Sequence, residues 1–135
     1  MQIYPVEMQI LYCAIALGIL QLLLAILASV GGRGLPWAAG NRDEGWPPLS
    51  KIGGRIERAY KNFLETFPFF AAAVLLAHAL SKSTHTSVLG SQIYIWARLI
   101  YVPVYVIGIP YARTIAWIAS LAGIVMVMAA VWPGM

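Results

Sequence analysis

The sequence predicts an all-α integral membrane protein, a single domain (residues 1–135) folded as a bundle of four membrane-spanning helices. The first observation is composition: 61% of the 135 residues are hydrophobic and 10% are charged, whereas soluble domains carry about 25% charged residues. A soluble fold of this size could not bury so much apolar surface. The second observation is segmentation, because four apolar stretches approach the roughly 20 residues that a membrane helix needs.

The first apolar stretch, residues 8–30, carries no charge. The residues before it contain Glu7 and no Lys or Arg, so the basic start of a signal peptide is missing and we expect a retained helix. Residues 31–54 combine Gly, Pro and several charges, which is typical of a loop. Cys13, the single cysteine, is expected to be a small buried apolar residue.

Three further helices follow this loop. The second expected span begins with polar residues and the third carries Arg98 near its middle, whereas the fourth is free of charge. The expected spans are residues 8–30, 55–80, 88–108 and 114–132, joined by the loop at 31–54, a polar turn at 81–87 and a tight connection at 109–113.

The positive charges predict the orientation in the membrane. Residues 31–55 hold four Lys and Arg residues and the third connection holds Arg113, whereas the opposite side has Lys82 alone. The positive-inside rule places the connections at 31–54 and 109–113 in the cytoplasm, with both termini on the non-cytoplasmic side. Trp37 and Trp46 suit anchoring at the membrane interface.

Composition also excludes several function classes. The basic residues are few and scattered, whereas nucleic-acid binding needs a clustered basic face. One cysteine cannot form an internal disulfide, and no spacing typical of metal ligands occurs. We therefore expect neither a nucleic-acid partner nor a metal site.

The second span carries a polar stripe. Arg58, Asn62 and Glu65 follow an i, i+4, i+7 spacing and share one helix face, with Lys61 beside it. Glu65 lies about 15 Å along the helix axis from Arg55, at 1.5 Å per residue. The stripe therefore reaches into the membrane.

The third span carries a matching stripe of Arg98, Tyr101 and Tyr105 at i, i+3, i+7. Because Arg98 reaches a depth similar to that of Glu65, we expect the two charges within hydrogen-bonding or one-water distance. A central Arg facing lipid costs about 2.5–3.5 kcal/mol, so both stripes are expected to face the bundle interior.

Two interpretations of these stripes remain open from the residues alone. One is a structural ion pair that sets the register of two helices. The other is a cavity, open to the cytoplasm, for an anionic ligand. The set holds more positive charge than Glu65 can neutralise, which favours the ligand.

Two motifs carry a resemblance to a known family. The stretch "ERAYKNFLETFPFF" resembles the signature of the MAPEG superfamily, the membrane-associated proteins in eicosanoid and glutathione metabolism. In that signature an Arg is followed by Asn at +4, Glu at +7 and Pro at +10. The matching residues are Arg58, Asn62, Glu65 and Pro68.

The second motif, "ARLIYVPVY", resembles the third-helix pattern of the family through Arg98, Tyr101 and Tyr105, and Arg113 with its neighbour Thr114 matches the start of the fourth helix. The resemblance covers nearly the whole chain, which looks like a short bacterial-type member. Pro103 is expected to interrupt the third helix.

The resemblance implies a homotrimer that binds glutathione between subunits and acts on a lipophilic substrate. Arg58, Lys61 and Arg98 would hold the carboxylates of glutathione, and Glu65 its ammonium group. Arg113 would be the catalytic residue that stabilises the thiolate. The implied glutathione-binding residues are Arg58, Lys61, Asn62, Glu65, Arg98, Tyr101, Tyr105 and Thr114.

The expected function is therefore that of a glutathione-dependent membrane transferase or peroxidase in a bacterial inner membrane. A non-catalytic binding or accessory subunit of a larger membrane complex remains an alternative, and glutathione binding without turnover would indicate it. A small four-helix transporter is the third class. Such transporters use an isolated membrane carboxylate, whereas Glu65 is surrounded by cations. The sequence leaves the lipophilic substrate open.

Overall fold

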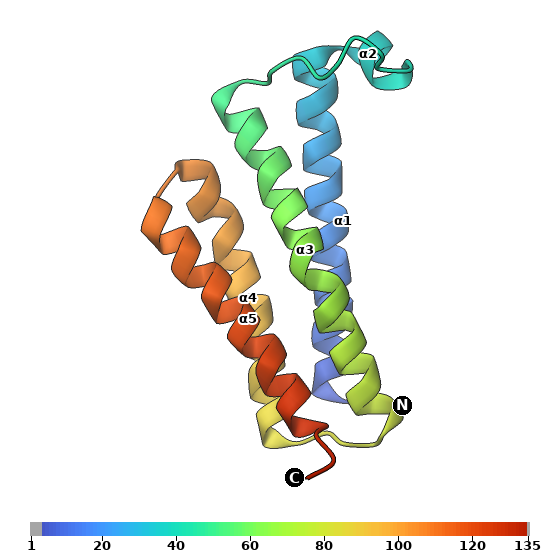
Figure 1. The fold of residues 1–135 in the computed structure, drawn as a ribbon, viewed down its shortest axis with the longest axis vertical. Coiled ribbons are helices and arrows are strands. Elements are labelled where there is room, and N and C mark those ends of the chain that lie inside the picture. Colours follow the sequence, from blue (N-terminus) through green and yellow to red (C-terminus); the bar gives the residue numbers. More distant parts are fainter. Residues whose placement is uncertain (1–3, 135) are drawn as a thin grey trace.

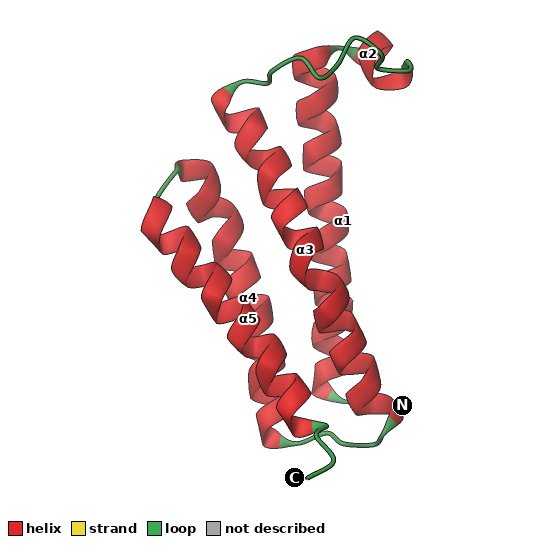
Figure 2. Cartoon of the chain, in the orientation of Figure 1, coloured by secondary structure: helices red, strands yellow, loops and turns green. Residues whose placement is uncertain are grey.

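The computed structural model describes residues 4–134. Within these residues the chain forms five α-helices and no strand (Figure 2), which confirms the prediction of an all-α fold. The helices are α1 (Val6–Arg33), α2 (Leu35–Ala39), α3 (Lys51–Ala79), α4 (His85–Ile107) and α5 (Pro110–Ala130).

Among the described helices, α1, α3 and α5 are long and apolar enough to cross a membrane. The structure thus gives three candidate spans where the sequence analysis expected four. The expected third span corresponds to α4, which has 23 residues and carries Arg98 in its middle.

The four long helices form two antiparallel pairs. Figure 1 shows α1 running beside α3 and α4 beside α5. The contacts within each of these two pairs are more extensive than those between any other two helices. The pairs lie close together at the end that holds both termini and splay apart toward the end that holds α2. The connection between α4 and α5 lies at this splayed end.

The core has two parts. The larger cluster joins α1, α3, α4 and α5 and includes Phe70 and Tyr94, whose rings stack with centroids 3.9 Å apart. The smaller cluster consists of Ala59, Tyr101, Tyr105 and Ala116, with Trp117 packed against it. The smaller cluster thus contains two residues of the polar stripe that the sequence analysis identified on the third span.

The contact between α4 and α5 depends on two glycines. A Cβ atom on Gly90 would lie 2.6 Å from the carbonyl oxygen of Gly123, and one on Gly123 would lie 2.5 Å from that of Gly90. Small residues allow such close approach of helices in membranes. The two backbones therefore leave no room for a side chain on either helix at this crossing.

The first loop is shorter than expected. The helix α3 begins at Lys51 rather than at residue 55, because the Ser50 side chain accepts a hydrogen bond from the Gly53 amide, at 3.1 Å, and caps the helix. Gly53 is therefore helical, although the sequence analysis assigned it to the loop. The short helix α2 also lies within the segment expected to be loop.

The connection between α4 and α5 is also shorter than the expected residues 109–113. Gly108, with φ of 94°, ends α4 in the left-handed conformation that glycine favours. Pro110 is the first residue of α5, a position where its missing N–H costs nothing. The expectation that Pro103 interrupts the third helix is wrong, because α4 continues through it to Ile107. Arg113 therefore lies inside the first turns of α5.

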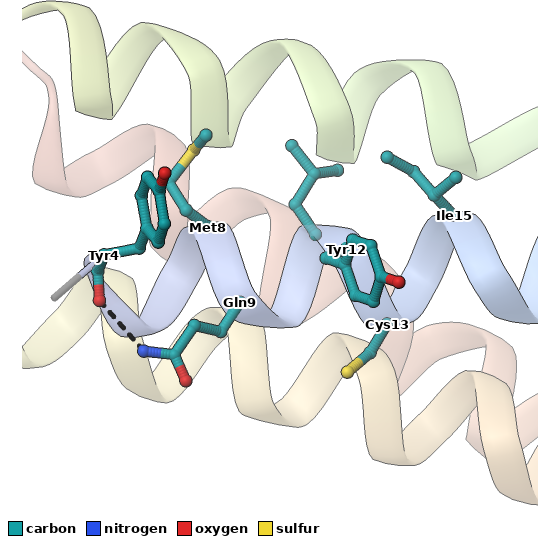
Figure 3. Close-up of a pocket in the computed structure, with 7 residues that line it drawn as sticks. Tyr4, Met8, Gln9, Tyr12, Cys13 and Ile15 are labelled. Carbon is teal, nitrogen blue, oxygen red and sulfur yellow. Dashed lines mark hydrogen bonds between the residues drawn. The ribbon is translucent and has the colours of Figure 1, made fainter. Parts of the chain in front are cut away.

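The prediction of a buried Cys13 is also wrong, because its side chain is exposed. Apolar residues surround α1 on all sides, so the sequence pattern does not show which face packs inward. Figure 3 shows Tyr12 and Cys13 beside a hollow of about 570 Å³ along α1. The residues lining this hollow are Tyr4, Met8, Gln9, Leu11, Tyr12, Cys13 and Ile15. None of them belongs to the predicted site.

The glycine contact generates the first prediction. Gly123→Ala places a methyl group against the α4 backbone, which cannot move aside as a flexible side chain could. We expect the free energy of unfolding in detergent to fall by about 1–3 kcal/mol, the usual cost of overpacking. Gly31→Ala is the matched control, because a Cβ there meets no atom within 4 Å. A Gly123→Ala protein as stable as the Gly31→Ala protein would contradict the close contact.

Candidate functional site

The polar stripes of α3 and α4 meet along the interface between the two helices. The Arg58 Nε atom donates a hydrogen bond to the Tyr105 hydroxyl at 3.0 Å. Arg98 Nη1 donates to the Asn62 side-chain oxygen at 2.9 Å. Because the helices are antiparallel, the first contact lies nearer the splayed end and the second lies deeper in the bundle.

Glu65 and Arg98 were expected within hydrogen-bonding or one-water distance, and the structure shows neither a direct hydrogen bond nor an ion pair between them. Among residues 4–134 the only ion pair joins Arg33 to Glu57. Asn62 lies between the two expected partners: its amide oxygen accepts from Arg98 and its amide nitrogen donates to Glu65 Oε2 at 3.3 Å. The two charges are thus connected through one neutral side chain.

Arg98 is 1% exposed. Its guanidinium carbon lies 4.5 Å from the centroid of the Tyr101 ring and 5.6 Å from that of Phe63. Such contacts with ring faces compensate part of the lost hydration. Its Nε and Nη2 atoms have no hydrogen-bond acceptor within the described part of the chain. A buried cation with two unsatisfied donor groups can bind an incoming acceptor.

A cavity of about 310 Å³ lies at the splayed end, beside the connection between α4 and α5. The residues lining it are Arg55, Arg58, Tyr105, Gly108, Pro110 and Arg113. The Arg113 guanidinium lies 4.9 Å from the centroid of the Tyr105 ring. Among the described residues, three guanidinium groups and no carboxylate line the cavity, so its electrostatic potential favours an anion.

Arg55 was not among the predicted ligands. It donates hydrogen bonds to the carbonyl oxygens of Val106 at 3.0 Å and Ile107 at 3.3 Å, and so caps the C-terminal end of α4. A Cβ on Gly108 would lie 2.7 Å from the Arg55 guanidinium. The glycine thus lets this cation approach the end of α4. In the sequence, Arg55 stands three residues before Arg58, and this spacing was the available signal that Arg55 lies beside the polar stripe.

Of the eight predicted glutathione-binding residues, Arg58 and Tyr105 line the cavity, and six do not: Lys61, Asn62, Glu65, Arg98, Tyr101 and Thr114. The Lys61 ammonium lies 5.7 Å from the centroid of the Trp46 ring, beside the first loop. The Thr114 hydroxyl donates a hydrogen bond to the Pro110 carbonyl at 3.3 Å, within the first turn of α5. Both side chains would have to leave these partners to contact a ligand in the cavity.

A cluster that the sequence did not predict joins the C-terminal end of α1 and the segment after it to α3. Arg33 donates to the two Glu57 carboxylate oxygens at 3.0 and 3.2 Å. Its guanidinium carbon lies 5.0 Å from the Trp37 ring centroid and 5.1 Å from that of Trp46. The two tryptophans, expected only as interfacial anchors, thus also contact a cation. In the sequence, Glu57 lies four residues before Lys61 on the same helix, and this spacing gave no indication that Arg33 is the partner of Glu57.

Comparison with known proteins identifies the family of this chain. A model of the MAPEG family matches residues 10–132, nearly the whole chain. No curated protein and no solved structure gives a significant match.

The family includes glutathione-dependent transferases and non-catalytic members, and its members commonly form trimers. Within the matched region, Arg58 and Asn62 of α3 contact α4 at the interface described above. The family match and the candidate membrane helices lead to one conclusion: this chain is a membrane protein of the MAPEG family.

Proposed function

We propose that this protein is a glutathione-dependent transferase or peroxidase that acts on a lipophilic electrophile. The observation that carries the proposal is the cavity of about 310 Å³ with three arginines and no acidic lining residue. Its volume lies at the lower end of the roughly 300–1,000 Å³ typical of small-molecule sites. Glutathione is a tripeptide with two carboxylates, one ammonium and a thiol. Its carboxylates suit these arginines, whereas its ammonium group needs an acidic residue outside the cavity lining.

The binding roles follow from the contacts of each residue. Arg58 is a hydrogen-bond donor at the cavity wall, and Arg98 has two buried N–H groups that lack acceptors within residues 4–134. In this proposal a carboxylate of glutathione accepts from Arg58 at the cavity wall, and a second one accepts from Arg98 only after passing beyond the cavity lining, which does not include Arg98. Glu65 is exposed and suits the ammonium group. Neutral hydrogen bonds come from Asn62, Tyr101 and Tyr105, while Lys61 and Thr114 join only after turning from their present partners.

Arg113 is the proposed catalytic residue. A guanidinium beside the sulfur favours the thiolate over the thiol, whose pKa is about 8.5 in free cysteine. The thiolate is the nucleophile: its lone pair forms a sulfur–carbon bond with the electrophile as the leaving group departs. The N-terminal end of α5 adds a favourable partial positive charge. The carboxylate contacts at Arg58 and Arg98 leave Arg113 available for the sulfur.

The proposed position in the membrane gives glutathione and the lipophilic substrate separate routes to the site. Glutathione enters from water at the splayed end, which we place in the cytoplasm with both termini on the opposite side of a bacterial inner membrane. The lipophilic substrate arrives from the bilayer. We include α4 as the fourth span, because its single Arg is buried inside the bundle. In the proposed homotrimer a neighbouring subunit closes the open side of the site.

The catalytic role of Arg113 can be tested by Arg113→Ala. We expect glutathione affinity by isothermal titration to change little, the ultraviolet absorbance of the bound thiolate to disappear, and turnover of an aryl halide to fall roughly 10²-fold or more. Arg42→Ala removes an equal charge from the first loop and is expected to leave all three unchanged. An Arg113→Ala protein with normal thiolate signal and turnover would overturn the role. Wild-type protein that binds glutathione without turnover would instead identify a non-catalytic member.

The bridging role of Asn62 gives a second test. Asn62→Leu removes the hydrogen-bond acceptor of a buried guanidinium, and we expect about 1–3 kcal/mol of lost stability. Asn62→Asp keeps an acceptor for Arg98 and is expected to be more stable than Asn62→Leu. Thermal unfolding in detergent measures both, with the exposed substitution Gln92→Leu as control. Equal stability of the Leu and Asp variants would show that the bridge contributes nothing.

The proposed orientation is tested by cysteine labelling in a Cys13→Ser background. Asn41 and Thr86 are exposed and lie at opposite ends of the bundle. Cysteines placed there are expected to react with a membrane-impermeant reagent from opposite sides of sealed vesicles. Reaction of both from the same side would contradict the four-span arrangement.

A further inference from the structure

A second polar site lies at the end of the bundle opposite the arginine cavity. Glu7, in the first turn of α1, is 3% exposed. Its Oε1 atom accepts hydrogen bonds from the Ser83 hydroxyl, at 2.7 Å, and from the Ser87 hydroxyl. These donors come from the α3–α4 turn and the first turn of α4, so one carboxylate joins three segments.

The other carboxylate oxygen has no partner among the described residues. Glu7 Oε2 is buried, and no donor reaches it within residues 4–134. The single ion pair of this described range involves Glu57 at the far end of α3. A buried carboxylate without a cation is costly unless a proton or an external cation neutralises it. The N-terminal end of α4 beside it favours the ionised form.

Glu7 lines a cavity of about 280 Å³. The residues lining this Glu7 cavity are Pro5, Glu7, Met8, Val74, Ala77, His78, Ser81 and Ser83. One part of the wall is apolar, and the polar part consists of one carboxylate, two hydroxyl groups and one imidazole. Its described lining contains no Lys or Arg, which is the reverse of the arginine cavity.

These observations limit the chemistry of the ligand. A divalent metal needs several oxygen or nitrogen ligands, and the described residues contain no group of three acidic, His or Cys side chains that could hold one. A quaternary ammonium is recognised by a cage of aromatic rings, which the Glu7 cavity lacks. A primary ammonium supplies N–H donors for Oε2 and a compensating positive charge.

We propose that the Glu7 cavity binds a primary ammonium group attached to an amphiphile, with Glu7 as its counter-ion. The apolar wall at Met8, Val74 and Ala77 fits the rest of such a molecule. The cavity lies where α1 begins and α3 ends, at the end of the bundle that holds both termini (Figure 1). A helix end of this kind lies at the headgroup level of a bilayer. An aminophospholipid headgroup and a soluble amine share the required chemistry, and this proposal does not depend on the glutathione activity.

The test compares lipids that differ in the methylation of one amine. Wild-type protein in mild detergent receives equal amounts of phosphatidylethanolamine and phosphatidylcholine, and native mass spectrometry measures which lipid remains bound. We expect phosphatidylethanolamine to be retained at least tenfold in excess. A parallel titration with soluble ethanolamine distinguishes the sources, because competition at millimolar concentration indicates a site for free amines. Equal retention of the two lipids together with no effect of ethanolamine would overturn the proposal.

Variants assign the site to Glu7. Glu7→Gln keeps the shape but removes the charge, and we expect the preference for phosphatidylethanolamine to disappear. Glu44→Gln, an equal charge change on the exposed first loop, is expected to retain it. A preference retained in Glu7→Gln would place the lipid elsewhere and refute the assignment.

A measurement on the wild type covers the case in which Glu7→Gln does not fold. Infrared difference spectra recorded on adding phosphatidylethanolamine are expected to show a perturbed carboxylate stretch. They are expected to show no loss of a protonated carboxyl band. Spectra with no carboxylate change would overturn the proposal without any variant.

Discussion

The burial of the Arg98 guanidinium between α3 and α4 is the interaction on which the arrangement of the site depends. In a membrane every polar group must find its partners inside the protein. Asn62 supplies one acceptor, and the rings of Phe63 and Tyr101 face the cation. Because these partners come from both helices, the need to shield one charge brings the two polar stripes together.

The two ends of the molecule have opposite electrostatic character. At the splayed end three arginines line one cavity, and at the other end a single buried carboxylate lines another. The tight crossing at Gly90 and Gly123 joins α4 to α5, while the larger core cluster holds the pairs together near the termini. The splayed end is thus the part of the molecule where a ligand has room to bind beside Tyr105.

Local contacts at the splayed end place the cations. Arg55 caps the last carbonyls of α4, and Gly108 provides the space for its guanidinium. Arg33 contacts Glu57, Trp37 of α2 and Trp46 of the first loop, and it does not line the cavity. The same residue type therefore serves as a helix cap, as an anchor for the first loop and, in the proposed site, as a donor to the ligand. Which role each arginine takes depends on the acceptors that the fold places within reach.

The sequence by itself determined the all-α class, the long apolar helices and the residues that share each polar stripe, because composition and the helical period are local properties. Only the tertiary structure decided that Asn62 stands between Glu65 and Arg98, that Lys61 contacts a loop tryptophan, and that Cys13 faces outward. The pairing of Glu7 with two serines about 80 residues away belongs to the same group. Helical spacing shows which residues share a face, whereas the partner of each side chain depends on how neighbouring helices rotate and how far each side chain reaches.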